Sequence, residues 1–269
     1  MSTKRLFDVN IQNVNLPKNL YKYREWTDVN HRKTLTHNEL YMAEPNSFKD
    51  DFDCKIPIRY DLLTDEEKFD FIMSLVKKNF PLLNTNEQEK LANQKIEEDL
   101  LSDKNRIKVF NDNFFKDLNN SIGVLCLTYS PNNLNMWNNY TQNGNGFCVG
   151  FHSKLLISKK NCFAGGMPVS YYHELPIIKP NFSIEEKYFT QIYSKLKKWE
   201  YENEFRLAKL NIQSRQVFLD NEVYSEVILG YNLSSESIEE ITSIVKNKFK
   251  NVQIKKSILK NQEVLIENL

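Results

Sequence analysis

The segment KKWEYENEFR, residues 197–206, concentrates acidic, basic and aromatic side chains. If it is extended, Glu202, Glu204 and Arg206 share one face, because side chains alternate between the two faces of a strand. Two carboxylates beside a guanidinium allow one acid with a raised pKa and one ionised base. These three residues are therefore the candidate catalytic residues. The same spacing also fits a structural ion network that holds the strand in place.

A second acidic cluster lies in FKDDFD, residues 48–53. Asp50, Asp51 and Asp53 have the oxygen ligands that a divalent cation prefers. Calcium loops need more ligands and a glycine at the bend, whereas aspartates in a turn accept backbone N–H bonds. The simpler interpretation is an Asx-type turn, and we predict no resident metal ion.

Aromatic side chains form a third cluster in MWNNYTQNGNGFCVGF, residues 136–151. Trp137 and Tyr140 are three residues apart, so they share a face if this stretch is helical. Such a pair before a glycine turn could stack on the ring of a ligand. Packing in the core is the alternative use of the same pair.

The histidines and cysteines have no spacing typical of a zinc site or a nucleophilic triad. No C-x-x-C pair occurs, and three cysteines lie in or beside apolar segments. We therefore expect buried free thiols in a reducing cytoplasm. The cysteines are Cys54, Cys126, Cys148 and Cys162.

Composition excludes several classes of protein. Thirty-six basic and 35 acidic residues give a net charge of +1, whereas general nucleic-acid binding normally needs a basic excess. The N-terminal residues lack the apolar segment of a secretory signal, and no apolar run is long enough to span a bilayer. With seven glycines and no glycine-rich phosphate loop, Rossmann and Walker sites are also excluded. We expect a cytoplasmic protein without membrane contact.

The first half of the chain reads as strand, helix, strand and then a helical segment. Residues 20–24 predict a strand, 27–37 a short helix and 39–45 a second strand. Thr64 opens a capping box, and apolar residues at intervals of three and four continue the helix until Pro81. Two more helices follow, so about 64–120 is predicted as a helical insertion within one domain, 1–269.

Strands return in the second half. Apolar runs predict strands at 122–128, 147–151, 163–171, 205–210 and 223–230, followed by two at the C-terminus. Helices are predicted at 132–142, 184–198 and 234–249. The predicted fold is α+β, a central mixed sheet with surrounding helices and a helical insertion.

In this order the motifs resemble a widespread bacterial family catalogued as domain of unknown function 2971. The matching blocks are LYKYR (20–24), NSFKDDFD (46–53), MWNNYT with GFCVGF (136–151), WEYENEFR (199–206) and EVILG (226–230). Two positions depart from the family pattern. The usual Asn-Asp-Pro turn is Lys49-Asp50-Asp51, and the histidine often found in the middle block is Asn139.

The strand–helix–strand opening and the later glutamates also allow a fold-level analogy to ADP-ribosyltransferases. That analogy implies NAD as a substrate, not as a tightly bound cofactor. Glu202 or Glu204 would stabilise positive charge on the ribose, and Arg206 would orient the glutamate or meet the pyrophosphate. The residues expected to bind substrate are Tyr23, Arg24, Ser47, Phe48, Asp50, Trp137 and Tyr140.

Three hypotheses for function follow from these clusters. The leading one is an intracellular enzyme acting on NAD or another nucleotide, by ADP-ribosyl transfer or NAD hydrolysis, in a toxin or phage-defence role. The second is a sensor that binds a ligand or protein without chemistry. The third is metal-dependent hydrolysis using the aspartates of 48–53 with Glu202 and Glu204.

Overall fold

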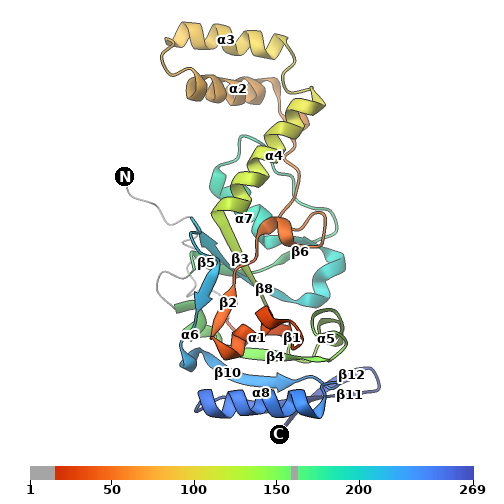
Figure 1. Ribbon diagram of the computed structural model, residues 1–269. Helices are drawn as coiled ribbons and strands as arrows, with labels where there is room; N and C mark the ends of the chain where they lie inside the picture. The colour runs from red at the N-terminus through yellow and green to blue at the C-terminus, as the bar shows by residue number, and fades with distance from the viewer. Residues whose placement is uncertain (1–15, 159–162) are drawn as a thin grey trace.

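The computed structural model describes residues 16–158 and 163–269, so Cys162 lies outside the described residues. Within them, an eight-stranded mixed sheet has the order β12-β11-β10-β4-β1-β3-β8-β5 (Figure 1). Neighbouring strands are antiparallel except for the parallel pair β10 and β11. Its strands are β1 (Asn19–Glu25), β3 (Ile122–Thr128), β4 (Gly146–His152), β5 (Gly165–Pro168), β8 (Glu204–Leu210), β10 (Tyr224–Leu229), β11 (Gln253–Lys260) and β12 (Glu263–Asn268).

Helices surround this sheet, which confirms the predicted α+β class. They are α1 (Val29–Thr36), α2 (Asp65–Asn79), α3 (Thr85–Glu97), α4 (Lys104–Ser121), α5 (Leu134–Tyr140), α6 (Ser153–Ser158), α7 (Ile184–Tyr193) and α8 (Ser235–Lys248). Two short strand pairs join β2 (Glu39–Tyr41) to β9 (Gln216–Phe218) and β6 (Ser170–Tyr172) to β7 (Ser194–Leu196). In the described residues no helix is long and apolar enough to cross a bilayer.

The main hydrophobic core lies between one face of the sheet and helices α1 and α8. Leu20 of β1 and Trp26, which follows β1, pack with Phe147 of β4 in this core. Ile241 and Val245 of α8 complete it. Apolar side chains buried in this way supply the main driving force for folding. Two positions on β1 between Leu20 and Trp26 carry charged side chains, and they face a cavity described below.

The sheet is split at its centre. β1 pairs with β4 along its whole length, but in the described residues it pairs with β3 at a single position, Tyr21↔Thr128. Further along β3, Val124 pairs instead with Ala43, which follows β2. β1 and β3 therefore separate on one side of this pair, and side chains from both strands line the gap.

The helical segment begins as the capping box predicts. Thr64 accepts a bond from the Glu67 amide at 3.2 Å, and Glu67 accepts one from the Thr64 amide at 2.9 Å. Helices α2 and α3 lie side by side away from the sheet, and α4 runs from them to β3 (Figure 1). Their apolar side chains share a small cluster with Ile178, which comes from outside the predicted insertion.

Several predicted boundaries in the second half are wrong. The helix predicted at 184–198 ends at Tyr193, where Arg206 donates to the Ile192 carbonyl at 2.8 Å. That carbonyl is thereby satisfied without a further helical turn. The strand predicted at 163–171 is two short strands, β5 and β6, in different sheets.

The segment 197–206 is also not extended throughout. Residues Lys197–Glu202 form a 3-10 helix (η4), and Asn203 has φ 44°, a left-handed conformation in which asparagine is common. Only after this bend does β8 begin, at Glu204. Glu204 and Arg206 share a strand face as predicted, but Glu202 reaches the same place from the end of a helical turn.

Candidate functional site

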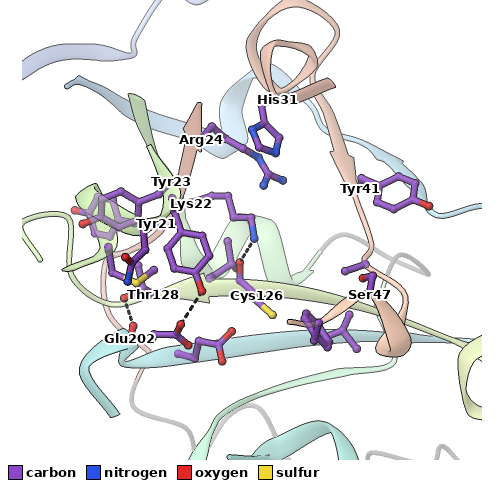
Figure 2. A pocket seen from close by; sticks show the side chains of 18 of the residues that line it. Tyr21, Lys22, Tyr23, Arg24, His31, Tyr41, Ser47, Cys126, Thr128 and Glu202 are labelled. Carbon is purple, nitrogen blue, oxygen red and sulfur yellow. Dashed lines mark hydrogen bonds between the residues drawn. The ribbon is translucent and has the colours of Figure 1, made fainter. Parts of the chain in front are cut away.

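A cavity of about 970 Å³ lies at the split between β1 and β3. Its other walls come from α1, α5, η4 and the segment after β2. The size suits a ligand as large as a dinucleotide, since small-molecule sites are typically about 300–1,000 Å³. Figure 2 shows Glu202 at one end of the view, Arg24 and His31 at the other, and Lys22 between them.

The cavity brings together predicted site residues from segments far apart in the sequence. Eight of the ten line it, namely Tyr23, Arg24, Ser47, Phe48, Asp50, Tyr140, Glu202 and Glu204. The other two, Trp137 and Arg206, are fully buried behind the wall. The structure thus brings together clusters that the sequence could only list separately.

Glu202 is the carboxylate held at the edge of this cavity. The Tyr140 hydroxyl donates to its Oε1 at 2.6 Å, and the Lys195 ammonium donates to its Oε2. Lys195 also contacts Glu204 Oε2 and Asp53 Oδ2, each at 3.3 Å. One buried ammonium therefore joins three carboxylates.

Arg206 is the second cation of this network. Its Nη1 and Nη2 donate to the two carboxylate oxygens of Asp53, both at 2.8 Å, and Nη2 also donates to Glu204 Oε2 at 2.8 Å. Two cations thus meet three carboxylates, which leaves a formal charge of −1. Bidentate pairing is the strongest geometry available to a guanidinium.

The network separates the pKa values of its carboxyl groups. Burial, followed by the charge of Glu204, raises the pKa of Glu202. Burial alone would raise the pKa of Glu204 and Asp53, but the charge of Arg206 holds both below their usual values. Glu202 is therefore closest to neutrality and can exchange a proton, while the other two remain ionised.

Lys195 and the pairing of Asp53 were not predicted from the sequence. Burial would lower the pKa of Lys195, but the charges of Glu204 and Asp53 hold it above the usual value. In the sequence Lys195 looks like one of many surface lysines beside a charged segment. Its only signal is proximity, seven residues before Glu202.

The three aspartates of 48–53 lie in different environments. Asp53 belongs to the buried network, Asp50 accepts a bond from the Trp199 indole N–H at 2.8 Å, and Asp51 is exposed. Among the described residues no group of three or more histidine, cysteine or acidic side chains could hold a metal ion. The aspartates do not form the joint oxygen cage that the metal-dependent hypothesis would use.

Trp137 and Tyr140 take different environments despite their spacing on α5. Trp137 packs edge-on against Tyr23, with ring centroids 5.1 Å apart, and its indole donates to the Pro131 carbonyl at 2.9 Å. Tyr140 instead turns its hydroxyl to Glu202. Asn139 also lines the cavity and donates to the Tyr201 hydroxyl at 3.3 Å.

The opposite part of the cavity is basic. Lys22 and Arg24 on β1 line it, and Lys22 donates to the carbonyl of Cys126 on β3 at 2.7 Å (Figure 2). His31 of α1 lies beside them. Burial, followed by the charge of Arg24, lowers the pKa of His31 to about 4, so this ring is neutral at physiological pH. Lys22 was not predicted, because nothing in the sequence LYKYR distinguishes it from a surface lysine.

Cys126 is the cavity's thiol. Burial, followed by the charge of Glu204, raises its pKa to about 12, which opposes a role as a nucleophile. Cys54 and Cys148 are buried free cysteines, as predicted, whereas Cys126 is free but only partly buried. The prediction for Cys162 falls outside the described residues.

Residues 136–207 match the model of a family described as a protein of unknown function (DUF2971). This segment runs from α5 into β8 and includes Tyr140, Lys195, Glu202 and Glu204. The match confirms the family resemblance over this segment, which contains two of the five motif blocks, 136–151 and 199–206. No curated protein and no solved structure matches the chain.

Proposed function

We propose that this protein is an enzyme that cleaves the bond between nicotinamide and ribose in NAD, either by ADP-ribosyl transfer or by hydrolysis. The observation that carries the proposal is Glu202, a buried carboxylate at the cavity wall held by Tyr140 on one oxygen and Lys195 on the other. A fixed carboxylate is the group that an oxocarbenium-like transition state needs.

In the proposed reaction the glycosidic C–N bond breaks and nicotinamide leaves with the electron pair. Positive charge then develops on the ribose, and ionised Glu202 stabilises it. Water or an acceptor nucleophile forms the new bond to the ribose carbon and loses its proton. The raised pKa of Glu202 suits it to accept that proton, as a general base works best near the operating pH.

Within this proposal Glu204 and Arg206 position the site. Both belong to the buried network with Asp53, which fixes Lys195 and thereby Glu202. Trp199 at the cavity wall offers a ring for stacking near Glu202. The place of action proposed is the cytoplasm, where NAD is abundant, and loss of NAD there accounts for a toxin or phage-defence role.

The test compares two glutamates with matched surroundings. Glu226 is buried like Glu202 and also binds a tyrosine hydroxyl and a lysine, at 2.7 Å from Tyr21 and 2.5 Å from Lys255. NAD is incubated with the purified chain, and nicotinamide, ADP-ribose and protein adducts are measured by mass spectrometry. We expect Glu202→Gln to lose about a hundredfold or more of the activity and Glu226→Gln to retain it.

The folded state of each variant is checked by thermal unfolding. Glu202→Gln brings the formal charge of the network from −1 to zero, so we expect it to fold. Turnover by Glu202→Gln equal to wild type would contradict the proposed role of this carboxylate. NAD binding without any turnover by wild type would favour the sensor hypothesis instead.

A further inference from the structure

Two cations interrupt the core-facing side of β1. Leu20 and Trp26 both lie in the main hydrophobic core, and Lys22 and Arg24 stand between them at the same period of two. Both charged side chains line the cavity. Burying a charge without a partner is energetically costly. The groups around Lys22 and Arg24 therefore indicate whether their charges are compensated within the protein or available to a ligand.

Arg24 lines the cavity without a partner among the described residues. Within residues 16–158 and 163–269 it forms no hydrogen bond or ion pair, and its Nε is buried without an acceptor. The acidic group acting on it is Asp28, which already accepts bonds from the backbone amides of Asn30 and His31. The guanidinium therefore presents its donors to the cavity.

Lys22 is similarly uncompensated. It donates to the Cys126 carbonyl, and among the described residues no carboxylate lies within ion-pair distance of it. Glu202 and Glu204 face it from η4 and β8, but both are bonded to Lys195. The carboxylates that act on the pair through their charge, Asp28, Glu202 and Glu204, thus all bind other groups, and Glu39 and Asp50 also line the cavity.

The titration of the pair reflects burial that the nearby carboxylates do not offset. Burial, followed by the charge of Arg24, lowers the pKa of Lys22 to about 8. Burial also lowers the pKa of Arg24 to about 10. An anion bound between the two side chains would reverse both effects, because an opposite charge favours the charged form.

We propose that Lys22 and Arg24 form an anion subsite that binds the pyrophosphate of a dinucleotide substrate. The choice of a pyrophosphate rests on the proposed function; the anion subsite itself rests on the two unpaired cations. Lys22 lies between Arg24 and Glu202 in Figure 2, so a ligand held here extends toward the carboxylate end of the same cavity. The substrate class is a molecule with a pyrophosphate and a glycosidic bond.

Binding to the full chain tests the subsite without requiring turnover. ADP-ribose, inorganic pyrophosphate and adenosine are titrated calorimetrically into wild type, Arg24→Met and Arg59→Met. Arg59 is an exposed arginine that does not line the cavity, so it controls for loss of an arginine charge. We expect wild type and Arg59→Met to bind the first two probes and Arg24→Met to lose about tenfold or more in affinity.

Thermal unfolding separates lost binding from lost folding. Arg24 forms no hydrogen bond with any other described residue, so Arg24→Met should melt no lower than wild type. A second variant, Glu202→Gln, should keep its affinity for pyrophosphate. Binding of adenosine as tight as that of ADP-ribose would place the recognition on the base and overturn the anion subsite.

The dependence on pH tests Lys22 separately. The diester pyrophosphate of ADP-ribose keeps its charge between about pH 7 and pH 10, so a change in affinity over this range reports the protein. Only protonated Lys22 attracts the anion, so wild-type affinity should fall as pH rises through about 8. Lys22→Arg should retain its affinity up to about pH 9, below the pKa of Arg24 at about 10.

Failure of the subsite and failure of the proposed function give different results. Pyrophosphate binding that depends on Arg24, without consumption of NAD, supports the subsite alone. NAD consumption that Arg24→Met leaves unchanged supports the enzyme and overturns the subsite. Equal affinity of wild type and Arg24→Met for ADP-ribose, or no binding of either anion to wild type, also overturns it.

Discussion

Arg206 and Asp53, 153 residues apart in the chain, form a fully buried bidentate pair with both N–O distances at 2.8 Å. The pair fastens the loop after β2 to β8, which carries Glu204. It therefore fixes the relative positions of two cavity walls. The position of Glu202 depends on this pair through Lys195, which contacts Asp53 and Glu202 together.

Replacing Arg206 should destabilise the protein strongly. Arg206→Met leaves Asp53 and Glu204 buried with one remaining cation, and breaking a buried pair from one side costs about 3–5 kcal/mol. The free energy of unfolding is measured with urea. The exposed pair of Arg59 and Asp61 is the matched control, and Arg59→Met should change stability far less. Similar losses in both variants would contradict a structural role of the buried network.

Acidification should remove part of the stability through Asp53 and Glu204. In the folded protein the charge of Arg206 outweighs burial and holds both pKa values below the ordinary 3.8 and 4.5. Their contribution is therefore present above those ordinary values and is lost as pH falls toward the folded pKa values. Urea unfolding at about pH 7, 5 and 3.5 measures the loss. An Asp53→Asn, Glu204→Gln variant, less stable at neutral pH, should show a smaller loss.

Glu202 has the opposite linkage. Its pKa is raised in the folded protein, by burial and then by Glu204, so protonation on lowering the pH favours the folded state. Glu202→Gln should consequently lose more stability than wild type between about pH 7 and pH 4.5. Parallel curves for the two proteins would mean that the carboxyl titrates normally.

Tyr140 should affect the pH profile of catalysis. Its hydroxyl donates to Glu202 at 2.6 Å and so favours the ionised carboxylate. In Tyr140→Phe the pKa of Glu202 rises, and the acidic limb of the rate profile should shift to higher pH. The rate at neutral pH should fall by roughly tenfold or more. A fall in rate without a shift would assign Tyr140 to substrate contact instead.

Cys126 should react slowly despite its place on the cavity wall. Its pKa of about 12 leaves almost no thiolate at about pH 8. Iodoacetamide labelling followed by peptide mass spectrometry should show the Cys126 peptide unmodified in the native protein and modified after unfolding. Cys126→Ser should retain activity. Rapid labelling of the native protein would indicate an accessible thiolate that this geometry does not support.

Local patterns were sufficient to predict the strands of the main sheet and most helix starts, but not the short strands β7 and β9 or helix α6. The apolar run at 122–128 and the capping box at Thr64 act through neighbouring residues, so they are visible in the sequence. Eight predicted site residues also meet in one cavity. Their types, carboxylate, aromatic and guanidinium, are unusual enough to be noticed without knowledge of the fold.

The ion network could not be predicted in the same way. Whether a lysine such as Lys195 or Lys22 is buried depends on which distant segments surround it. Arg206 was expected at the substrate, but its partner Asp53 lies 153 residues earlier and draws it into the interior. The end of α7 at Tyr193 has the same cause, because Arg206 binds a helical carbonyl there.

The eight-stranded sheet has two parts, here called bodies, which in the described residues pair with each other only at Tyr21 and Thr128, between β1 and β3. This junction is the seam. One body carries Lys22 and Arg24 on β1, and the other carries Glu202 and Glu204 beside and on β8. A molecule that contacts both ends of the cavity spans this seam and links the two bodies. Its binding energy then also resists separation of the two bodies, so the amides flanking the seam should exchange with solvent more slowly when the cavity is filled.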